Sequence, residues 1–154
     1  MGEHRKTITV NRKARHDYTI IETFEAGIAL RGTEVKSLRQ GRANLRDSYG
    51  MVVDRELYLC DAHISPYDHG TCANHDPVRN RKLLMHRREI DRIAGRMQER
   101  GLALVPLRMY FKRGRAKVEV ALARGKREYD KRQSIKRRIA DREAERALSD
   151  RRRT

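Results

Sequence analysis

Apolar and polar residues alternate along several short stretches of the chain, and this two-residue period predicts β-strands. The first stretch is 7–10. A less strictly alternating one covers 18–25, as expected for a strand near the edge of a barrel. Two further strands are predicted at 51–53 and 56–64, and Pro66 ends the second because proline cannot donate a ladder hydrogen bond.

The last predicted hairpin consists of 103–112 and 115–123, with Gly114 in the turn. Alternation assigns apolar side chains to its inner face: Val105, Leu107, Met109, Phe111, Val118, Val120 and Leu122. The other face receives Arg108, Tyr110, Lys112, Lys117 and Glu119. The pattern predicts a mainly β protein with helices: an OB-like antiparallel β-barrel of about six strands, with about three helices packed on it.

A short helix is predicted after Gly32. Thr33 is a suitable N-cap, because its hydroxyl can accept a hydrogen bond from a first-turn amide. Val35 and Leu38 lie three residues apart on one face, and Gly41 can end the helix in a left-handed conformation. Five charged residues are then expected to face solvent or a partner: Glu25, Glu34, Lys36, Arg39 and Arg42.

A longer helix is predicted over 83–100, followed by Gly101. Its apolar stripe consists of Ile90, Ile93, Ala94 and Met97. An arginine ladder with a four-residue spacing follows the opposite side: Arg88, Arg92, Arg96 and Arg100. A solvated face is the usual interpretation of such a ladder, and RNA contact is the alternative.

The composition changes after residue 124, which divides the chain into a barrel domain, 1–124, and a basic tail, 125–154. The tail holds twelve Lys or Arg and six Asp or Glu, with too few apolar residues to build a core. Its residues nevertheless favour helix. We therefore expect the tail to be disordered when free and helical on RNA.

Charge restricts the class of partner. The 154 residues include 37 Lys or Arg and 21 Asp or Glu, a net charge of +16, and nucleic acid is the first polyanion to consider. A membrane surface is the alternative, but no long amphipathic helix with an aromatic apolar face is predicted. No apolar run approaches the ~20 residues of a membrane span. The expectation is a soluble, cytoplasmic, monomeric protein.

Motifs for catalysis are weak. The pattern C-x2-H-x5-H-x2-C-x2-H invites a zinc site, but alternation places Cys60 and His63 on opposite faces of a strand, and the paired C-x2-C of a zinc ribbon is absent. No P-loop, dinucleotide fingerprint or nucleophile elbow occurs. We expect no metal, no cofactor and no enzymatic activity, and keep a zinc-dependent enzyme as an alternative.

Residues 11–18 concentrate positive charge. They form either a solvated connector or an RNA-facing segment, in which Arg12, Lys13 and Arg15 contact phosphates and His16 or Tyr18 stacks on a base.

Motifs in one order along nearly the whole chain carry a family resemblance. They include F-E-A-G-I-A-L, G-T-E-V-K-S-L-R, H-I-S-P-Y, N-H-D-P-x-R-x-R-K-L-L, G-L-A-L-V-P-L-R-M-Y-F-K, A-K-V-E-V and A-R-G-K-R-E-Y-D-K-R. In these motifs the chain resembles the SmpB family, the small protein partners of transfer-messenger RNA (tmRNA, or SsrA RNA). The resemblance implies an OB-like barrel that binds the tRNA-like domain of tmRNA and delivers alanyl-tmRNA to stalled ribosomes. The barrel would replace the missing anticodon half, and the tail would occupy the empty mRNA channel and permit peptide tagging.

The resemblance also implies roles for single residues. Glu25, Leu84 and Lys117 match positions tied to tmRNA binding, although Leu84 could instead be a core residue. With the basic residues above, the predicted tmRNA-binding set is Glu25, Leu84, Lys117, Arg12, Lys13 and Lys36. The set predicted for the decoding centre and tail is His16, Lys126, Tyr129, Asp130, Lys131, Arg132, Ile135, Lys136 and Arg137.

A second interpretation is a generic OB-type RNA-binding or ribosome-associated protein without a dedicated RNA. Such a protein would lose affinity for all RNAs alike as salt rises, because phosphate contacts carry the binding. An adaptor for tmRNA should retain a preference for the tRNA-like fold at moderate salt, because shape and exposed bases contribute.

Overall fold

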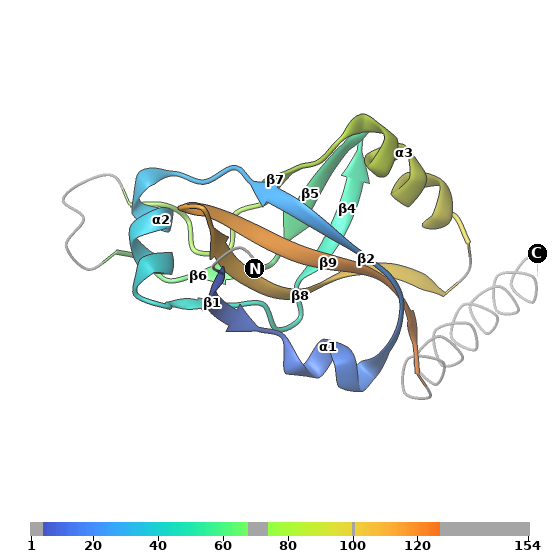
Figure 1. Ribbon diagram of the computed structural model, residues 1–154, viewed down its shortest axis with the longest axis horizontal. Helices are drawn as coiled ribbons and strands as arrows, with labels where there is room; N and C mark the ends of the chain where they lie inside the picture. The colour runs from blue at the N-terminus through green and yellow to red at the C-terminus, as the bar shows by residue number, and fades with distance from the viewer. Residues whose placement is uncertain (1–4, 68–73, 100, 127–154) are drawn as a thin grey trace, which may run out of the picture.

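The structure is a computed structural model that describes residues 5–67, 74–99 and 101–126 (Figure 1). Its elements are, in chain order, β1 (Arg5–Val10), α1 (Arg12–Asp17), β2 (Tyr18–Ile28), α2 (Gly32–Arg39), β3 (Ala43–Asn44), β4 (Tyr49–Val53), β5 (Glu56–Cys60), β6 (His63–Ile64), β7 (Arg81–Leu84), α3 (Arg87–Arg96), β8 (Leu102–Lys112) and β9 (Arg115–Gly125).

Six antiparallel strands close into a ring in the order β8-β4-β5-β7-β2-β9, because β9 pairs with β8 as well as with β2. This confirms the predicted barrel and its last hairpin. Strand β1 adds to β8 outside the ring, and β3 and β6 form a separate two-stranded sheet. Figure 1 shows α2 and α3 at opposite ends of the barrel and α1 beside the sheet.

The main core fills the ring and is closed by α3. Leu57, Leu59 and Val120 are fully buried in it, and Ile90 and Ile93 of α3 pack against the same cluster. This confirms the apolar stripe predicted for the helix.

The start of the predicted helix over 83–100 is wrong, because Leu84 belongs to strand β7 and the helix runs only from Arg87 to Arg96. In β7, Arg81 and Leu83 are buried while Lys82 and Leu84 are exposed, which is the alternation of a strand. Four residues are too short a stretch for this period to stand out beside the stronger helical period that follows.

The inner face predicted for β8 is also partly wrong. The register between β8 and β9 shifts between Pro106 and Arg108, and this bulge reverses the alternation along the strand. As a result, Met109 faces the main core, whereas Val105 and Leu107 pack outside the ring against Ala14 of α1.

The N-terminus of α2 differs from the prediction as well. Arg31 takes the N-cap position, and the backbone amide of Arg31 donates to the Glu34 carboxylate at 2.7 Å. Thr33 instead shares a 2.8 Å hydrogen bond with His75 Nδ1. The predicted end is confirmed, since the Gly41 amide bonds the Leu38 carbonyl and Gly41 has a φ of 70°.

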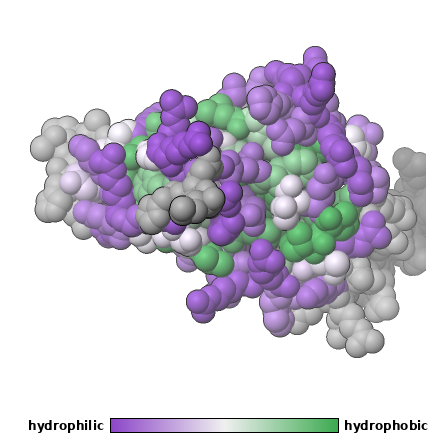
Figure 2. All heavy atoms as spheres, in the orientation of Figure 1, coloured by the Kyte–Doolittle hydropathy of each residue, from purple (hydrophilic) through white to green (hydrophobic). Residues whose placement is uncertain are grey.

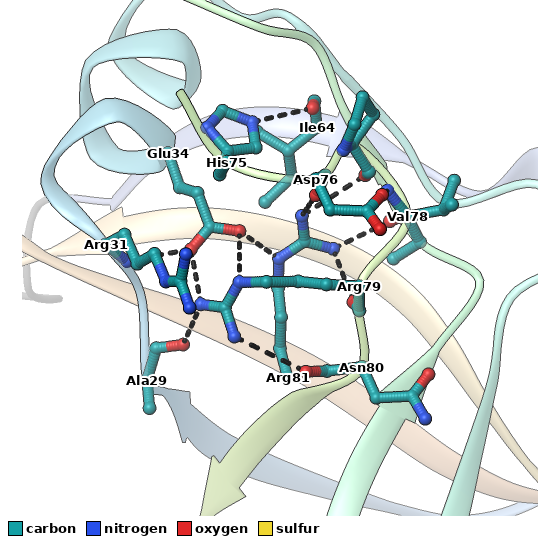
Figure 3. Close-up of polar contacts among 12 residues, drawn as sticks. Ala29, Arg31, Glu34, Ile64, His75, Asp76, Val78, Arg79, Asn80 and Arg81 are labelled. Carbon is teal, nitrogen blue, oxygen red and sulfur yellow. Dashed lines mark hydrogen bonds and ion pairs between the residues drawn. The ribbon is translucent and has the colours of Figure 1, made fainter. Parts of the chain in front are cut away.

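Glu34, which was predicted to face solvent or a partner, is fully buried in an ion-pair cluster (Figure 3). Its carboxylate accepts hydrogen bonds from the guanidinium groups of Arg79 and Arg81. Arg81 is also fully buried and donates to the Ala62 carbonyl at 2.7 Å and to the Pro77 carbonyl at 3.2 Å. The cluster therefore attaches α2 to β7 and to the segment before it.

The cluster determines the protonation state of Glu34. Burial opposes ionisation, but hydrogen bonds from Arg79, the Arg31 amide and Arg81 outweigh it and lower the pKa of the Glu34 carboxyl. A lowered pKa means that the stabilisation is present above the ordinary glutamate pKa of about 4.3. It is lost as the pH falls through the lowered value in the folded protein.

The substitution Glu34→Gln should lower the free energy of unfolding by about 3–5 kcal/mol, because it leaves a buried guanidinium without its anion. Urea denaturation at neutral pH measures this loss, and the loss should shrink on acidification below the ordinary carboxyl pKa. The control is Glu56→Gln, which removes a carboxylate paired on the surface with Lys82 and Arg87. Equal losses in the two variants would contradict the role given to the buried cluster.

Candidate RNA-binding surface

Three neighbouring strands bring Leu84 and Lys117 close to Gly27. Gly27 of β2 is the register partner of Leu84 in β7 on one side and of Lys117 in β9 on the other. A Cβ at Gly27 would lie 3.3 Å from the Cβ of Leu84, so the absence of a side chain permits this close packing. Leu84 is 52% exposed, and the alternative that it belongs to the core is wrong.

Glu25 lies two residues before Gly27 in β2 and completes the group. The side chains of Glu25, Leu84 and Lys117 line one open hollow on the barrel surface, which we call the Glu25 hollow; its other lining residues are Gly27, Met85, His86 and Glu89. The structure thus places together the three residues that the family resemblance singled out from distant parts of the sequence.

The Glu25 carboxylate is surrounded by donors. Tyr110 donates its hydroxyl hydrogen to Glu25 Oε2, and Lys112 Nζ lies 3.1 Å from Oε1. Arg5 is 3.6 Å from Oε2. The hydrogen bond from Tyr110 is the main cause that lowers the pKa of Glu25, with Lys112 and Arg5 adding to it against the effect of burial.

A second group of predicted residues lies around α1. The segment 11–18, predicted as a solvated connector or an RNA-facing segment, is mostly helical: Arg12–Asp17 form a helix that Asn11 caps by accepting from the Ala14 amide, and Tyr18 begins β2. The buried Asn11 side chain also donates to the Pro106 carbonyl at 2.9 Å. Sequence reasoning missed this anchor, although asparagine before a helix is a recognisable signal.

Helix α1 also marks the place where the described chain ends. The Lys126 amide donates to the Asp17 carbonyl at 2.9 Å, and Lys126 Nζ donates to the Arg15 carbonyl at 3.2 Å. His16 has an 83% exposed side chain in the same turn of α1, with Nδ1 3.1 Å from Asp17. His16 and Lys126 are therefore brought together.

The remaining predicted residues are placed differently. Arg12 is exposed on α1, and Lys13 pairs with Asp47 at 2.9 Å. Lys36 is on α2, away from the lining of the Glu25 hollow, with its ammonium 5.4 Å from the centre of the Tyr67 ring. The other tail residues lie outside the described residues: Tyr129, Asp130, Lys131, Arg132, Ile135, Lys136 and Arg137.

The arginine ladder of α3 is partly engaged within the protein. Arg92 forms an ion pair with Glu22 of β2 at 3.0 Å, and Arg96 pairs with Glu99 at 3.2 Å. Arg88 is exposed, and Arg100 lies outside the described residues. Figure 2 shows hydrophilic residues over most of one face, with hydrophobic patches between them.

The zinc pattern is only partly visible. Cys60 is buried and His63 is exposed, whereas His69 and Cys72 lie outside the described residues. Within 5–67, 74–99 and 101–126, no three His, Cys, Asp or Glu side chains are placed to hold a metal ion. In the same ranges no helix is long and apolar enough to cross a membrane.

The Glu25 hollow offers three chemical functions within one site. An ammonium group can contact a phosphate, an exposed leucine can pack against the face of a base, and a carboxylate can accept from N–H or O–H donors. Single-stranded or looped RNA displays all three kinds of partner.

Comparison with known proteins gives consistent results. The family described as SmpB protein matches residues 8–150. An SsrA-binding protein of Moorella thermoacetica is 60% identical over 152 residues, 98% of each chain, and one of Desulforudis audaxviator is 59% identical over 94% of this chain and 95% of its own. A chain from a solved structure described as "tmRNA-SmpB: a journey to the center of the bacterial ribosome" superposes with a TM-score of 0.67 at 55% identity, covering 77% of this chain and 84% of that one. The chain therefore belongs to the SmpB family.

Proposed function

We propose that this protein binds tmRNA through the Glu25 hollow and acts as a non-enzymatic adaptor that brings tmRNA to stalled ribosomes. The observation that carries the proposal is the convergence of Glu25, Leu84 and Lys117 on one open surface. Relatives across nearly the full length bear the name SsrA-binding protein, and the structural neighbour comes from work on tmRNA-SmpB and the ribosome.

Three residues of the hollow, Lys117, Leu84 and Glu25, have defined tasks in this proposal. Lys117 neutralises a phosphate of the tRNA-like domain, which contributes affinity that decreases with salt. Leu84 packs against an unstacked base, and Glu25 accepts a hydrogen bond from the RNA. The last two contacts depend on RNA shape and therefore provide the preference for one RNA.

In this proposal, the region around α1 is the part of the protein that contacts the ribosome. His16 and Lys126 face the decoding centre, the barrel takes the place of the missing anticodon half, and the tail from 125 to 154 enters the empty mRNA channel. The support is the contact of Lys126 with α1, which starts the tail beside the exposed His16. The adaptor would thereby allow alanyl-tmRNA to be accommodated and the nascent peptide to be tagged.

The experiment that tests the core of the proposal is a competition between tmRNA and an unrelated structured RNA of equal length at roughly physiological salt. A retained preference for tmRNA supports the adaptor. Equal binding, falling alike with salt for both RNAs, would support the generic RNA-binding alternative instead.

The substitution Leu84→Ala should weaken binding to the tRNA-like domain by about 5- to 30-fold, because it removes roughly 1–2 kcal/mol of apolar contact with a base. Filter binding or isothermal calorimetry measures the change. Val53→Ala is the matched control, because Val53 is 41% exposed on β4 and does not line the Glu25 hollow. An unchanged affinity for the Leu84 variant would argue against the hollow as the binding site.

The substitution Lys117→Ala should weaken tmRNA binding and reduce the slope of log affinity against log salt by about one unit, because one phosphate contact is lost. Arg39→Ala on α2 removes the same charge from an exposed position and is the control. If both variants lose affinity equally, overall charge rather than this site determines binding.

Ending the chain at Lys126 should leave the preference for tmRNA over an unrelated RNA within about twofold, because the Glu25 hollow and the Lys126 contacts with α1 remain. The loss of tail cations should weaken binding to both RNAs alike. Peptide tagging on a stalled ribosome should be abolished in a reconstituted translation assay. Substantial tagging by the shortened protein would refute the role proposed for the tail, while leaving the binding proposal intact.

A further inference from the structure

Tyr110 differs from its sequence-based prediction in an informative way. Tyr110 was predicted to face outward with Arg108 and Lys112. Its hydroxyl does contact the same Glu25 carboxylate as Lys112. Tyr110 is nevertheless only 1% exposed. It belongs to neither apolar cluster. The hydroxyl of a buried tyrosine normally needs a hydrogen-bond partner.

Two arginines enclose the ring of Tyr110. The guanidinium carbons of Arg5 and Arg108 each lie 5.1 Å from the ring centre, within the range of a cation–π contact. Arg5 comes from β1 and Arg108 from β8, and these strands pair with each other. The added strand β1 therefore contributes one of the two cations that lie against the Tyr110 ring.

The hydroxyl of Tyr110 crosses the barrel surface to a different strand. Tyr110 of β8 is the register partner of Lys117 in β9, and Glu25 lies in β2, two residues before Gly27, the β2 partner of Lys117. The hydroxyl donates to Glu25 Oε2, while Lys112 lies near both carboxylate oxygens, at 3.1 and 3.4 Å. Tyr110 and Lys112 thus hold the carboxylate, and Glu25 keeps a 34% exposed side chain at the hollow.

The contact between Tyr110 and Glu25 keeps the proton on the Tyr110 hydroxyl and the Glu25 carboxyl ionised. The bond from Tyr110 lowers the pKa of Glu25, while burial together with the Glu25 charge raises the pKa of Tyr110. Near neutral pH the tyrosine remains a donor and the glutamate an ionised acceptor. A carboxylate has about four acceptor sites. Three hydrogen bonds, one from Tyr110 and two from Lys112, leave about one site for a further donor.

We infer that Tyr110 is a positioning residue that fixes Glu25 as an acceptor for a hydrogen-bond donor of the RNA, an N–H of a base or a ribose 2′-hydroxyl. This inference rests on the proposed function. The fixed negative charge disfavours a phosphate at that point and leaves the phosphate to Lys117. Tyr110 would therefore act on the choice of RNA group through Glu25, without touching the RNA.

The test is a double-mutant cycle of Tyr110→Phe and Glu25→Gln, with affinity for the tRNA-like domain as the readout. Tyr110→Phe should weaken binding about five- to tenfold, the size of one typical net hydrogen bond, because Glu25 is no longer held in place for the RNA donor. In the Glu25→Gln background the same change should have almost no effect, because Tyr110 acts through the Glu25 charge. Equal losses in both backgrounds would overturn the inference and indicate a purely structural tyrosine.

Measuring RNA affinity against pH separates a positioning role of Tyr110 from a general loss of folding. The readout is the ratio of wild-type to Tyr110→Phe affinity as the pH falls from about 7 to the ordinary glutamate pKa of about 4.3. His86 and Glu89 also line the hollow and are the same in both proteins, so the ratio reports on Glu25, whose pKa is lowered by Tyr110. The Tyr110→Phe protein should lose additional affinity on acidification, because removing the hydroxyl raises the pKa of Glu25. Identical pH profiles for the two proteins would overturn the inference.

Two controls separate the possible failures. Tyr58→Phe removes a hydroxyl from β5, away from the Glu25 hollow, and should leave affinity unchanged. If the wild-type protein shows no preference for tmRNA over an unrelated RNA, the proposed function fails. If it shows the preference but Tyr110→Phe matches wild type, only the present inference fails.

A further experiment with modified RNA identifies the RNA group that donates the hydrogen bond to Glu25. The effect of Tyr110→Phe is measured again on a tRNA-like domain with 2′-deoxy substitutions in its loops. Disappearance of the effect assigns the donor to a ribose hydroxyl, and persistence assigns it to a base.

Discussion

Closure of the ring by β9 is the constraint on which the rest of the structure depends. This strand pairs with β2 along one edge and with β8 along the other, from Tyr18↔Gly125 to Gly27↔Lys117 on the β2 side. Backbone register therefore fixes the relative places of residues distant in sequence. Lys117 in β9 lies between Tyr110 in β8 and Gly27 in β2. The strand pairing of the closed ring therefore determines which residues line the Glu25 hollow.

Local patterns predicted the elements that have a long and regular period. The hairpin of β8 and β9, the apolar stripe of α3 and the barrel were recognisable because each repeats its pattern over many residues. The failures arose where a short or irregular feature decides the structure. Strand β7 is four residues long, and the bulge beside Pro106 reverses the alternation that placed Val105 and Leu107 inside.

Charged residues show a different limit of sequence reasoning. A glutamate on a polar helix face is expected at the surface, yet Glu34 is fully buried, because Arg79 and Arg81 approach it from 45 and 47 residues away. Alternation likewise gave the right side for Tyr110 but could not indicate that Arg5 and Arg108 cover it. For the candidate site, family motifs identified Glu25, Leu84 and Lys117, and only the fold placed them together.

The position of Glu25 is difficult to explain by charge alone. A protein of net charge +16 gains non-specific affinity for RNA from every cation, and an ionised carboxylate at the binding surface reduces that gain. The structure nevertheless holds this carboxylate with three donors, two of them cationic. A general polyanion site has no need of a carboxylate, whereas an acceptor held among the basic residues Lys112, Arg113, Arg115 and Lys117 is suitable for selecting a neutral donor group. On the proposed function, the many other cations supply affinity, and the Glu25 hollow supplies the discrimination between one RNA and the rest.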